Sequence, residues 1–146
     1  MTNVVNTIAP GFLLSLLLAS GCGAASSQGY QQDGDEALAW MAEKVAGLRI
    51  FADDAGKMNR SIQEINGDII VVSQFTLFAN IKKGNRPSYI KAASPEIAIP
   101  IYRQFVQNLE IELGKTIQTG EFGAMMDVAL INDGPVTIII DSKNRE

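Results

Sequence analysis

Residues 68–78, DIIVVSQFTLF, give the strongest strand prediction in the chain. The turn signal Asn66-Gly67 comes just before them, and the run from Ile69 to Val72 is apolar without alternation, as expected for a strand that is covered on both faces. Continued alternation would place successive side chains of residues 73–76 on opposite faces of the sheet. The segment therefore predicts a buried strand that ends in polar side chains.

A second segment, residues 132–137 with the sequence NDGPVT, joins two strand-like runs, Met126 to Asn132 and Val136 to Asp141. Gly134 has no side chain to block a close approach. The peptide bond between Gly134 and Pro135 is an X-Pro bond, the only kind whose cis form costs as little as roughly 0.5–1 kcal/mol. Taken alone, this segment also fits an ordinary Asp-Gly-Pro hairpin turn, just as residues 73–76 fit an ordinary strand end.

Two helices are predicted. Asp33 and Glu36 form a capping-box pattern, and Leu38, Met41, Ala42 and Val45 follow at helical spacing until Gly47.

The second helix begins with Ser94 as N-cap and Pro95 at the first helical position. Its predicted apolar row, spaced four residues apart, consists of Ile97, Ile101, Phe105, Leu109 and Leu113, and Gly114 ends it. Pro100 should bend this helix or mark a short preliminary turn, because proline cannot donate the helical hydrogen bond. Residues 80–93, before this helix, are polar and basic and predict a loop.

The composition limits the chemistry. With 146 residues, 47% of them hydrophobic, the chain is long enough for one substantial core and too short for two ordinary domains. A net charge of −4 argues against binding nucleic acid through an overall positive field, so any RNA contact must be local. The chain has no histidine, which excludes a Ser-His-Asp triad and a histidine-bearing zinc site. Neither a metal nor another cofactor is expected.

The first 32 residues are atypical, and we treat them as separate from a domain over residues 33–146. The apolar run from Ile8 to Ala19 leads to the single cysteine, Cys22, through a sequence like the end of a bacterial lipoprotein signal, but no lysine or arginine precedes Lys44. The run is also too short to span a bilayer as a helix. The run has three possible explanations. It is a buried strand, residues 12–18, of a cytoplasmic protein, or it results from a mis-called start, or it is the signal of an exported lipoprotein.

The two segments described first resemble the signature motifs of the D-aminoacyl-tRNA deacylases, also called the D-tyrosyl-tRNA deacylase family, which carry S-Q-F-T-L and N-x-G-P-V-T. Further similarity occurs, in the same order along the chain, at residues 48–51 (LRIF), 56–59 (GKMN), 83–89 (KGNRPSY) and 119–126 (TGEFGAMM). The resemblance runs from about Ala37 to Asp141. Such proteins normally begin with a basic strand of the form R-V-V-I-Q-R-V, which is not found here, and its loss would leave a sheet edge uncovered.

This resemblance implies an α/β (α+β) fold with two helices and a mainly antiparallel sheet or partly closed β-barrel. It also implies a homodimeric enzyme without cofactor that hydrolyses the ester of D-aminoacyl-tRNA, and of tRNA wrongly charged with glycine, and rejects L-aminoacyl-tRNA. The alternative is an exported, non-enzymatic binding module on the same scaffold, anchored by lipid on Cys22.

The resemblance also assigns roles to residues. Ser73, Gln74 and Met126 would bind the substrate, and the backbone N–H groups of Phe75 and Thr76 would face the scissile carbonyl. The Thr76 hydroxyl has no neighbouring base to activate it, so the family mechanism, in which the ribose 2′-hydroxyl of the substrate assists water, fits better.

Two further sets of residues receive roles in the same way. The carbonyl oxygens of the Gly134-cis-Pro135 unit would enter the partner's pocket and exclude an L side chain. Lys82, Lys83 and Arg86 are candidates for phosphate contact near the acceptor end, or else form an ordinary solvated loop.

Overall fold

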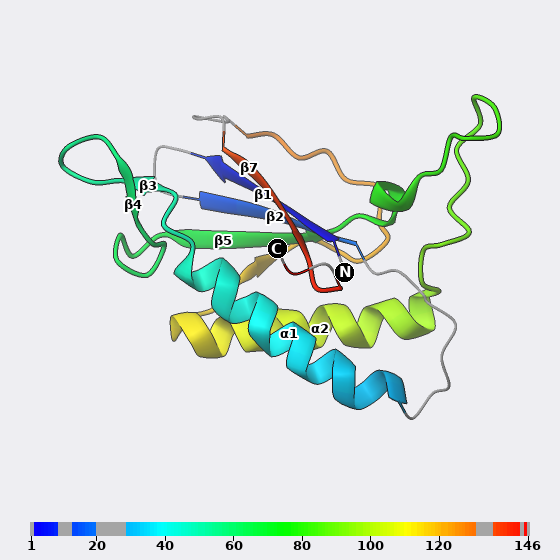
Figure 1. Ribbon diagram of the computed structural model, residues 1–146, viewed down its shortest axis with the longest axis horizontal. Helices are drawn as coiled ribbons and strands as arrows, with labels where there is room; N and C mark the ends of the chain where they lie inside the picture. The colour runs from blue at the N-terminus through cyan, green and yellow to red at the C-terminus, as the bar shows by residue number, and fades with distance from the viewer. Residues whose placement is uncertain (1, 9–12, 20–28, 131–135, 144, 146) are drawn as a thin grey trace.

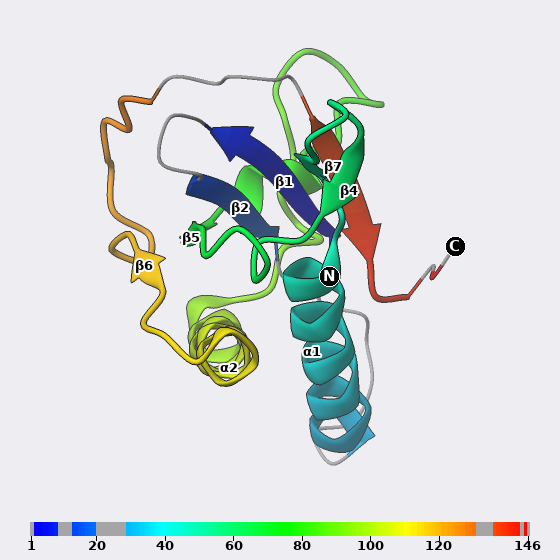
Figure 2. The same cartoon turned by 90° about the vertical axis from the view of Figure 1, so that its left-hand side faces the viewer.

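The structure is a computed structural model that describes residues 2–8, 13–19, 29–130, 136–143 and 145, with side chains from Gly34 onward. Two long helices lie on one side of a five-stranded sheet (Figures 1 and 2). The elements are β1 (Thr2–Ile8), β2 (Leu13–Ala19), α1 (Gly29–Gly47), β3 (Phe51–Ala52), β4 (Met58–Arg60), β5 (Asp68–Ser73), the 3₁₀ helix η1 (Phe75–Phe78), α2 (Pro95–Leu113), β6 (Gln118–Thr119) and β7 (Thr137–Asp141).

The sheet has the strand order β6-β5-β2-β1-β7, and β3 and β4 form a separate hairpin. β1 runs antiparallel to both β2 and β7, whereas β5 runs parallel to both β2 and β6. The predicted class, α/β with two helices, is confirmed in the form of a mixed sheet. Within the described residues this sheet does not close into a barrel.

The beginning of the chain lies inside the sheet. β2 confirms the strand predicted at residues 12–18, and β1, which was not predicted, pairs with it from Thr2↔Ala19 to Ile8↔Leu13. The sequence of β1, TNVVNTI, alternates poorly, so its strand character depends on the neighbours that it finds in the sheet. No helix in the described part of the chain is both long and apolar enough to cross a membrane. Cys22 lies outside the described residues.

α1 buries the apolar side chains that its spacing predicts: Leu38, Met41, Ala42 and Val45 are all at most 2% exposed. The helix starts at Gly29, earlier than the predicted capping residue Asp33. Trp40 lies at the edge of the buried stripe and packs against the core without entering it.

α2 begins at Pro95 after Ser94, as predicted, and ends at Gly114, whose φ of 65° is the left-handed conformation that glycine adopts easily. The helix continues through Pro100, so the predicted preliminary turn is wrong. The buried row is Ala98, Tyr102, Phe105 and Leu109, whereas Ile97 is 40% exposed. A row spaced strictly by four drifts around a helix of 3.6 residues per turn, which is why the predicted row leaves the buried face at its first position.

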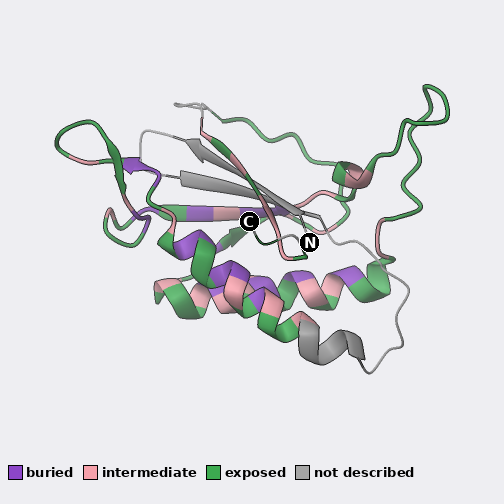
Figure 3. Cartoon of the chain, in the orientation of Figure 1, coloured by how far each residue is buried: buried purple, intermediate pink, exposed green. Residues whose placement is uncertain are grey.

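The core lies between the two helices and the sheet (Figure 3). Its fully buried side chains include Met41 and Val45 of α1, Phe105 and Leu109 of α2, and Val71 of β5. Burial of one such side chain stabilises the fold by about 1.5–3 kcal/mol. Two helices and β5 therefore share one core.

β5 ends at Ser73, before the predicted end at residue 78. The chain turns at Gln74, and the side-chain amide of Gln74 donates a hydrogen bond to the Thr76 hydroxyl. The Leu77 N–H bonds to the Gln74 carbonyl at 3.4 Å. These local bonds replace the sheet ladder, so the predicted alternation of residues 73–76 is wrong beyond Ser73.

The strand-like run predicted at residues 126–132 is also wrong where the structure describes it. Residues 124–130 form no strand, and all their side chains are exposed. A strand needs a neighbour to pair with, and no pairing of this segment is found within the described chain. The following run, predicted at residues 136–141, is confirmed as β7.

Candidate functional site

A cavity of about 510 Å³ opens where β5 ends. Its walls come from the end of β5 and η1, the loop before α2, the first turns of α2, and residues 122–128. The lining residues are Val72, Ser73, Gln74, Phe75, Tyr89, Ala92, Ala93, Pro95, Ala98, Tyr102, Phe122, Gly123, Ala124, Met126 and Val128. This size and mainly apolar lining suit a small organic group.

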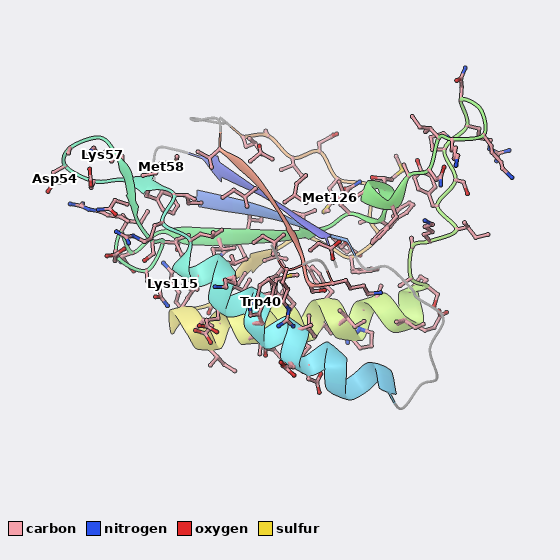
Figure 4. The ribbon with its side chains drawn as sticks, in the orientation of Figure 1. Trp40, Asp54, Lys57, Met58, Lys115 and Met126 are labelled. Carbon is pink, nitrogen blue, oxygen red and sulfur yellow. The ribbon has the colours of Figure 1, made fainter. Side chains whose placement is uncertain are left out.

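The structure brings together four of the predicted site residues. Ser73, Gln74, Phe75 and Met126 all line the cavity. Met126 belongs to the irregular segment 122–128 and lies beside η1 (Figure 4). Thr76 follows directly, and its hydroxyl is already engaged as an acceptor for Gln74.

Phe75 and Thr76 are the first two residues of η1. In a 3₁₀ helix each N–H bonds to the carbonyl three residues earlier, so the first N–H groups have no partner within the helix. The first bond of this turn is donated by Leu77. Within η1 the N–H groups of Phe75 and Thr76 therefore have no partner, and Phe75 lines the cavity, an arrangement that can stabilise a developing oxyanion.

An aromatic wall was missed by the sequence prediction. Phe75 and Tyr89 contact edge to face with ring centroids 5.2 Å apart, and Tyr102 and Phe122 do so at 5.6 Å. Tyr89 and Phe122 both lie within the segments that carry the family resemblance, which was the available signal for them. Tyr102 is visible only once the true buried row of α2 is known.

Tyr102 ties α2 to the end of β5. Its hydroxyl donates a hydrogen bond to the Val71 carbonyl at 2.9 Å, two residues before Ser73. Burial raises the pKa of the Tyr102 hydroxyl above its ordinary value, and hydrogen bonding with the Thr119 side chain acts in the opposite direction. The hydroxyl therefore stays protonated and holds the strand end in place at neutral pH.

The side chain of Met126 lies over Gly120. A Cβ atom added at Gly120 would lie 2.9 Å from both the Sδ and the Cε of Met126. A glycine at this position therefore leaves the room that the methionine side chain occupies at the cavity.

The predicted phosphate contacts, Lys82, Lys83 and Arg86, lie on a loop that projects from the body of the molecule (Figure 1). Asn80 and Ser88 close the loop through reciprocal backbone hydrogen bonds of 2.9 and 3.0 Å. The three side chains are exposed, and none of them is in an ion pair within the described residues. They do not line the cavity, so their contact with phosphate stays a prediction.

The opposite end of the molecule carries the segments LRIF and GKMN, around the β3–β4 hairpin (Figure 4). The Asp53 carboxylate accepts N–H bonds from Ala55 at 2.9 Å and Lys57 at 3.0 Å. The N–H of Lys57 is the largest cause of the lowered pKa of Asp53. Arg49 donates to the Asn59 carbonyl at 2.8 Å. These motifs build a hydrogen-bonded hairpin away from the cavity.

The predicted pair Gly134-Pro135 lies outside the described residues. Among the residues that the structure describes, no group of three or more His, Cys, Asp or Glu side chains has the arrangement of a metal site.

Comparison with known proteins gives consistent matches. The family profile described as D-Tyr-tRNA(Tyr) deacylase matches residues 3–141, so the similarity begins well before Ala37. A D-aminoacyl-tRNA deacylase of Flavobacterium psychrophilum is 66% identical over 114 residues, which cover 78% of this chain and 76% of that protein. One from Phocaeicola vulgatus is 50% identical over 139 residues, 90% of this chain and 93% of that protein.

A solved structure of a c-Myc DNA unwinding element binding protein has the same fold. It superposes with a TM-score of 0.78 at 30% sequence identity, and the match covers 97% of this chain and 98% of that one.

Proposed function

We propose that this chain, which belongs to the D-Tyr-tRNA(Tyr) deacylase family, hydrolyses the ester between a D-amino acid, or glycine, and the terminal ribose of tRNA, and spares L-aminoacyl-tRNA. The observation that carries the proposal is the cavity at the end of β5, where Ser73, Gln74, Phe75 and Met126 meet. The lipid-anchored alternative depends on Cys22, outside the described residues, whereas the family match supports an enzyme. We place the reaction in the cytoplasm, with charged tRNA.

The chemistry needs positioning more than a strong nucleophile, because an aminoacyl ester is already activated. The N–H groups of Phe75 and Thr76 are suited to the developing oxyanion. The described lining of the cavity contains no carboxylate, and the chain has no histidine, so no side chain there is suited to act as general base. Water assisted by the substrate's own 2′-hydroxyl is the attacking group in our proposal.

The substrate pocket is mainly apolar on the side of Ala98, Phe122 and Met126. Ser73 and Gln74 supply hydrogen-bonding groups at the strand end. A flexible methionine accommodates side chains of different shape, which fits a deacylase that accepts several D-amino acids.

We further propose that the enzyme acts as a homodimer in which Gly134-Pro135 of one chain completes the cavity of the other. Large apolar side chains are exposed near the cavity: Phe75 is 55%, Ile90 89%, Val128 52% and Met125 102% exposed. Residues 124–130 lead away from the cavity across the molecule toward β7 (Figure 1). A two-fold, self-complementary interface would cover this surface and bring Gly134-Pro135 of the partner to the cavity.

The central experiment compares D-tyrosyl-tRNA with L-tyrosyl-tRNA as substrates of the purified protein. We expect release of D-tyrosine and protection of the L ester, with no loss of rate in EDTA, because no step uses a metal. Equal rates for the two enantiomers would contradict the role of Gly134-Pro135. Loss of turnover in EDTA that zinc restores would contradict the metal-free mechanism.

Subunit exchange tests the shared site. Ser73→Phe blocks the cavity and Gly134→Val damages the dipeptide, and each variant alone should lose D-selective hydrolysis. After exchange, random pairing makes about half of the dimers mixed, each with one intact composite site. We expect D-selective hydrolysis to return in part in the mixture. A monomeric protein with full selectivity would show that the dipeptide acts within its own chain.

A further inference from the structure

A second hollow, of about 550 Å³, lies between α2 and residues 119–122. Tyr102 and Phe122 line both this hollow and the cavity at the end of β5. Their edge-to-face ring pair, 5.6 Å between centroids, is therefore the wall that separates the two spaces. A strand of nucleic acid whose last nucleotide occupies the first cavity can place its preceding nucleotide across this wall.

The hollow carries hydrogen-bonding groups of both kinds around aromatic and aliphatic surface. Arg103 and Glu121 are exposed side chains on opposite walls, with Gln107 one helical turn after Arg103. Neither Arg103 nor Glu121 is in an ion pair within the described part of the chain. Both groups are therefore available to a bound molecule.

Of the two pyrimidine bases of RNA, these groups match cytosine. Cytosine presents an exocyclic amino group, which can donate a hydrogen bond to a carboxylate. Its neighbouring ring acceptors can accept hydrogen bonds from arginine and glutamine. Uracil presents a carbonyl oxygen at the same position and would face the Glu121 carboxylate unfavourably. Aromatic side chains also favour base stacking in single-stranded RNA sites. The nucleotide before the terminal adenosine of every tRNA is a cytidine.

We propose that this hollow is a subsite for the penultimate cytidine of the acceptor end, with Glu121 accepting from the cytosine amino group and Arg103 contacting its ring acceptors or phosphate. The inference rests on the proposed function and extends it, because it makes recognition of the acceptor end independent of the amino acid.

The test uses three short substrates: D-tyrosyl-adenosine, D-tyrosyl-CpA and D-tyrosyl-UpA, each esterified at the terminal ribose. For the wild type we expect kcat/KM for the CpA substrate to exceed that for the adenosine substrate about tenfold, with UpA giving little gain. Arg103→Ala should bring the CpA-to-adenosine ratio close to one. Glu121→Gln should raise the rate for UpA, because the glutamine amide donates to the uracil carbonyl.

Gln104→Ala is the matched control. Gln104 is the exposed neighbour of Arg103 on α2, bonds to Asn108 at 3.0 Å, and lines neither space, so its removal should leave the CpA-to-adenosine ratio unchanged.

The outcomes separate the two proposals. A wild type that cleaves all three substrates with equal kcat/KM would overturn the cytidine subsite and leave the deacylase function standing. An Arg103→Ala variant that slows all three equally, with unchanged thermal stability, would also overturn it. A wild type that cleaves none of the three, nor D-tyrosyl-tRNA, would overturn the deacylase function and the subsite with it.

Discussion

The two halves of residues 68–78 have similar apolar character but different surroundings. In the first half Ile69 and Val71 are at most 1% exposed, whereas in the second half Phe75 and Leu77 are 55% and 40% exposed. The first half lies between β2 and β6 and contributes to the core beneath the helices. The second half has left the sheet and borders the cavity. Apolar residues are thus used for stability in one half and for a binding surface in the other.

The largest effect on stability should come from the first half's surroundings. Phe105 is fully buried in the core that includes Ile69 and Val71. Phe105→Ala should lower the free energy of unfolding by about 3–5 kcal/mol, because the cavity left behind collapses only in part. Unfolding by urea, followed by circular dichroism, measures this as a lower midpoint at unchanged slope.

The same substitution in the second half is the matched control. Phe75→Ala should change the free energy of unfolding by less than about 1 kcal/mol, because more than half of the ring is already exposed. It should instead lower kcat/KM for D-tyrosyl-tRNA roughly tenfold, since the ring lines the cavity and braces Tyr89. A stability loss as large as that of Phe105→Ala would end the distinction between the two halves.

The sequence predicted best those elements that their own apolar spacing and capping residues define. The buried residues of α1, the apolar run of β5 and the start of α2 follow from periodicity and capping, because their partners lie in the same core. The end of β5 was not predicted, because the turn at Gln74 depends on a hydrogen bond between two side chains. Nor was β1 predicted, whose polar sequence forms a strand only between two neighbours.

The same reasoning applies to the candidate site. Ser73, Gln74, Phe75 and Met126 were predicted through motif resemblance and are found together. The motifs could not show Tyr102, because it lines the cavity only in the orientation that α2 takes about its own axis. The run at residues 126–130 was predicted as a strand because it is apolar, but its side chains are exposed. An apolar run therefore does not by itself show that a segment pairs as a strand with its own sheet.

Tyr102 connects the two halves, and its hydroxyl is the second test. Tyr102→Phe leaves the Val71 carbonyl without this donor and should cost about 1 kcal/mol of unfolding free energy. Because the pKa of Tyr102 is raised in the folded state, its contribution is present below pH 10 and is lost as the pH rises through the folded-state pKa. In the alkaline range, the free energy of unfolding of the variant should therefore fall less steeply with rising pH than that of the wild type.

Enzymatic assays distinguish a positioning role of Tyr102 from a purely structural one. If the bond fixes the strand end before Ser73, Tyr102→Phe should lower kcat with little change in KM at a temperature where the variant is fully folded. Unchanged kcat would show that the position of the strand end does not depend on Tyr102.

The smallest effect should follow from Gly120→Ala. The added Cβ would lie 2.9 Å from the Sδ and Cε of Met126, and only the flexible end of that side chain needs to move. We expect a change below about 0.5 kcal/mol in unfolding free energy, as for most surface substitutions, and a change of a few-fold in KM because Met126 lines the cavity. Gly34→Ala is the control for KM, since its Cβ would contact nothing within 4 Å and it lies in α1, away from the cavity; in the helix this change should itself raise the free energy of unfolding by about 0.5–1 kcal/mol.

A double substitution decides whether Met126 is the cause. In a Met126→Ala background the side chain that would be displaced is absent, so adding Gly120→Ala should change KM no further, and the two effects should be non-additive. Equal effects of Gly120→Ala with and without Met126 would mean that the glycine acts through the backbone of residues 119–122. In that case Met126 would not act as an adaptable side chain facing the second half of residues 68–78. Tolerance for several D-amino acids would then need another source.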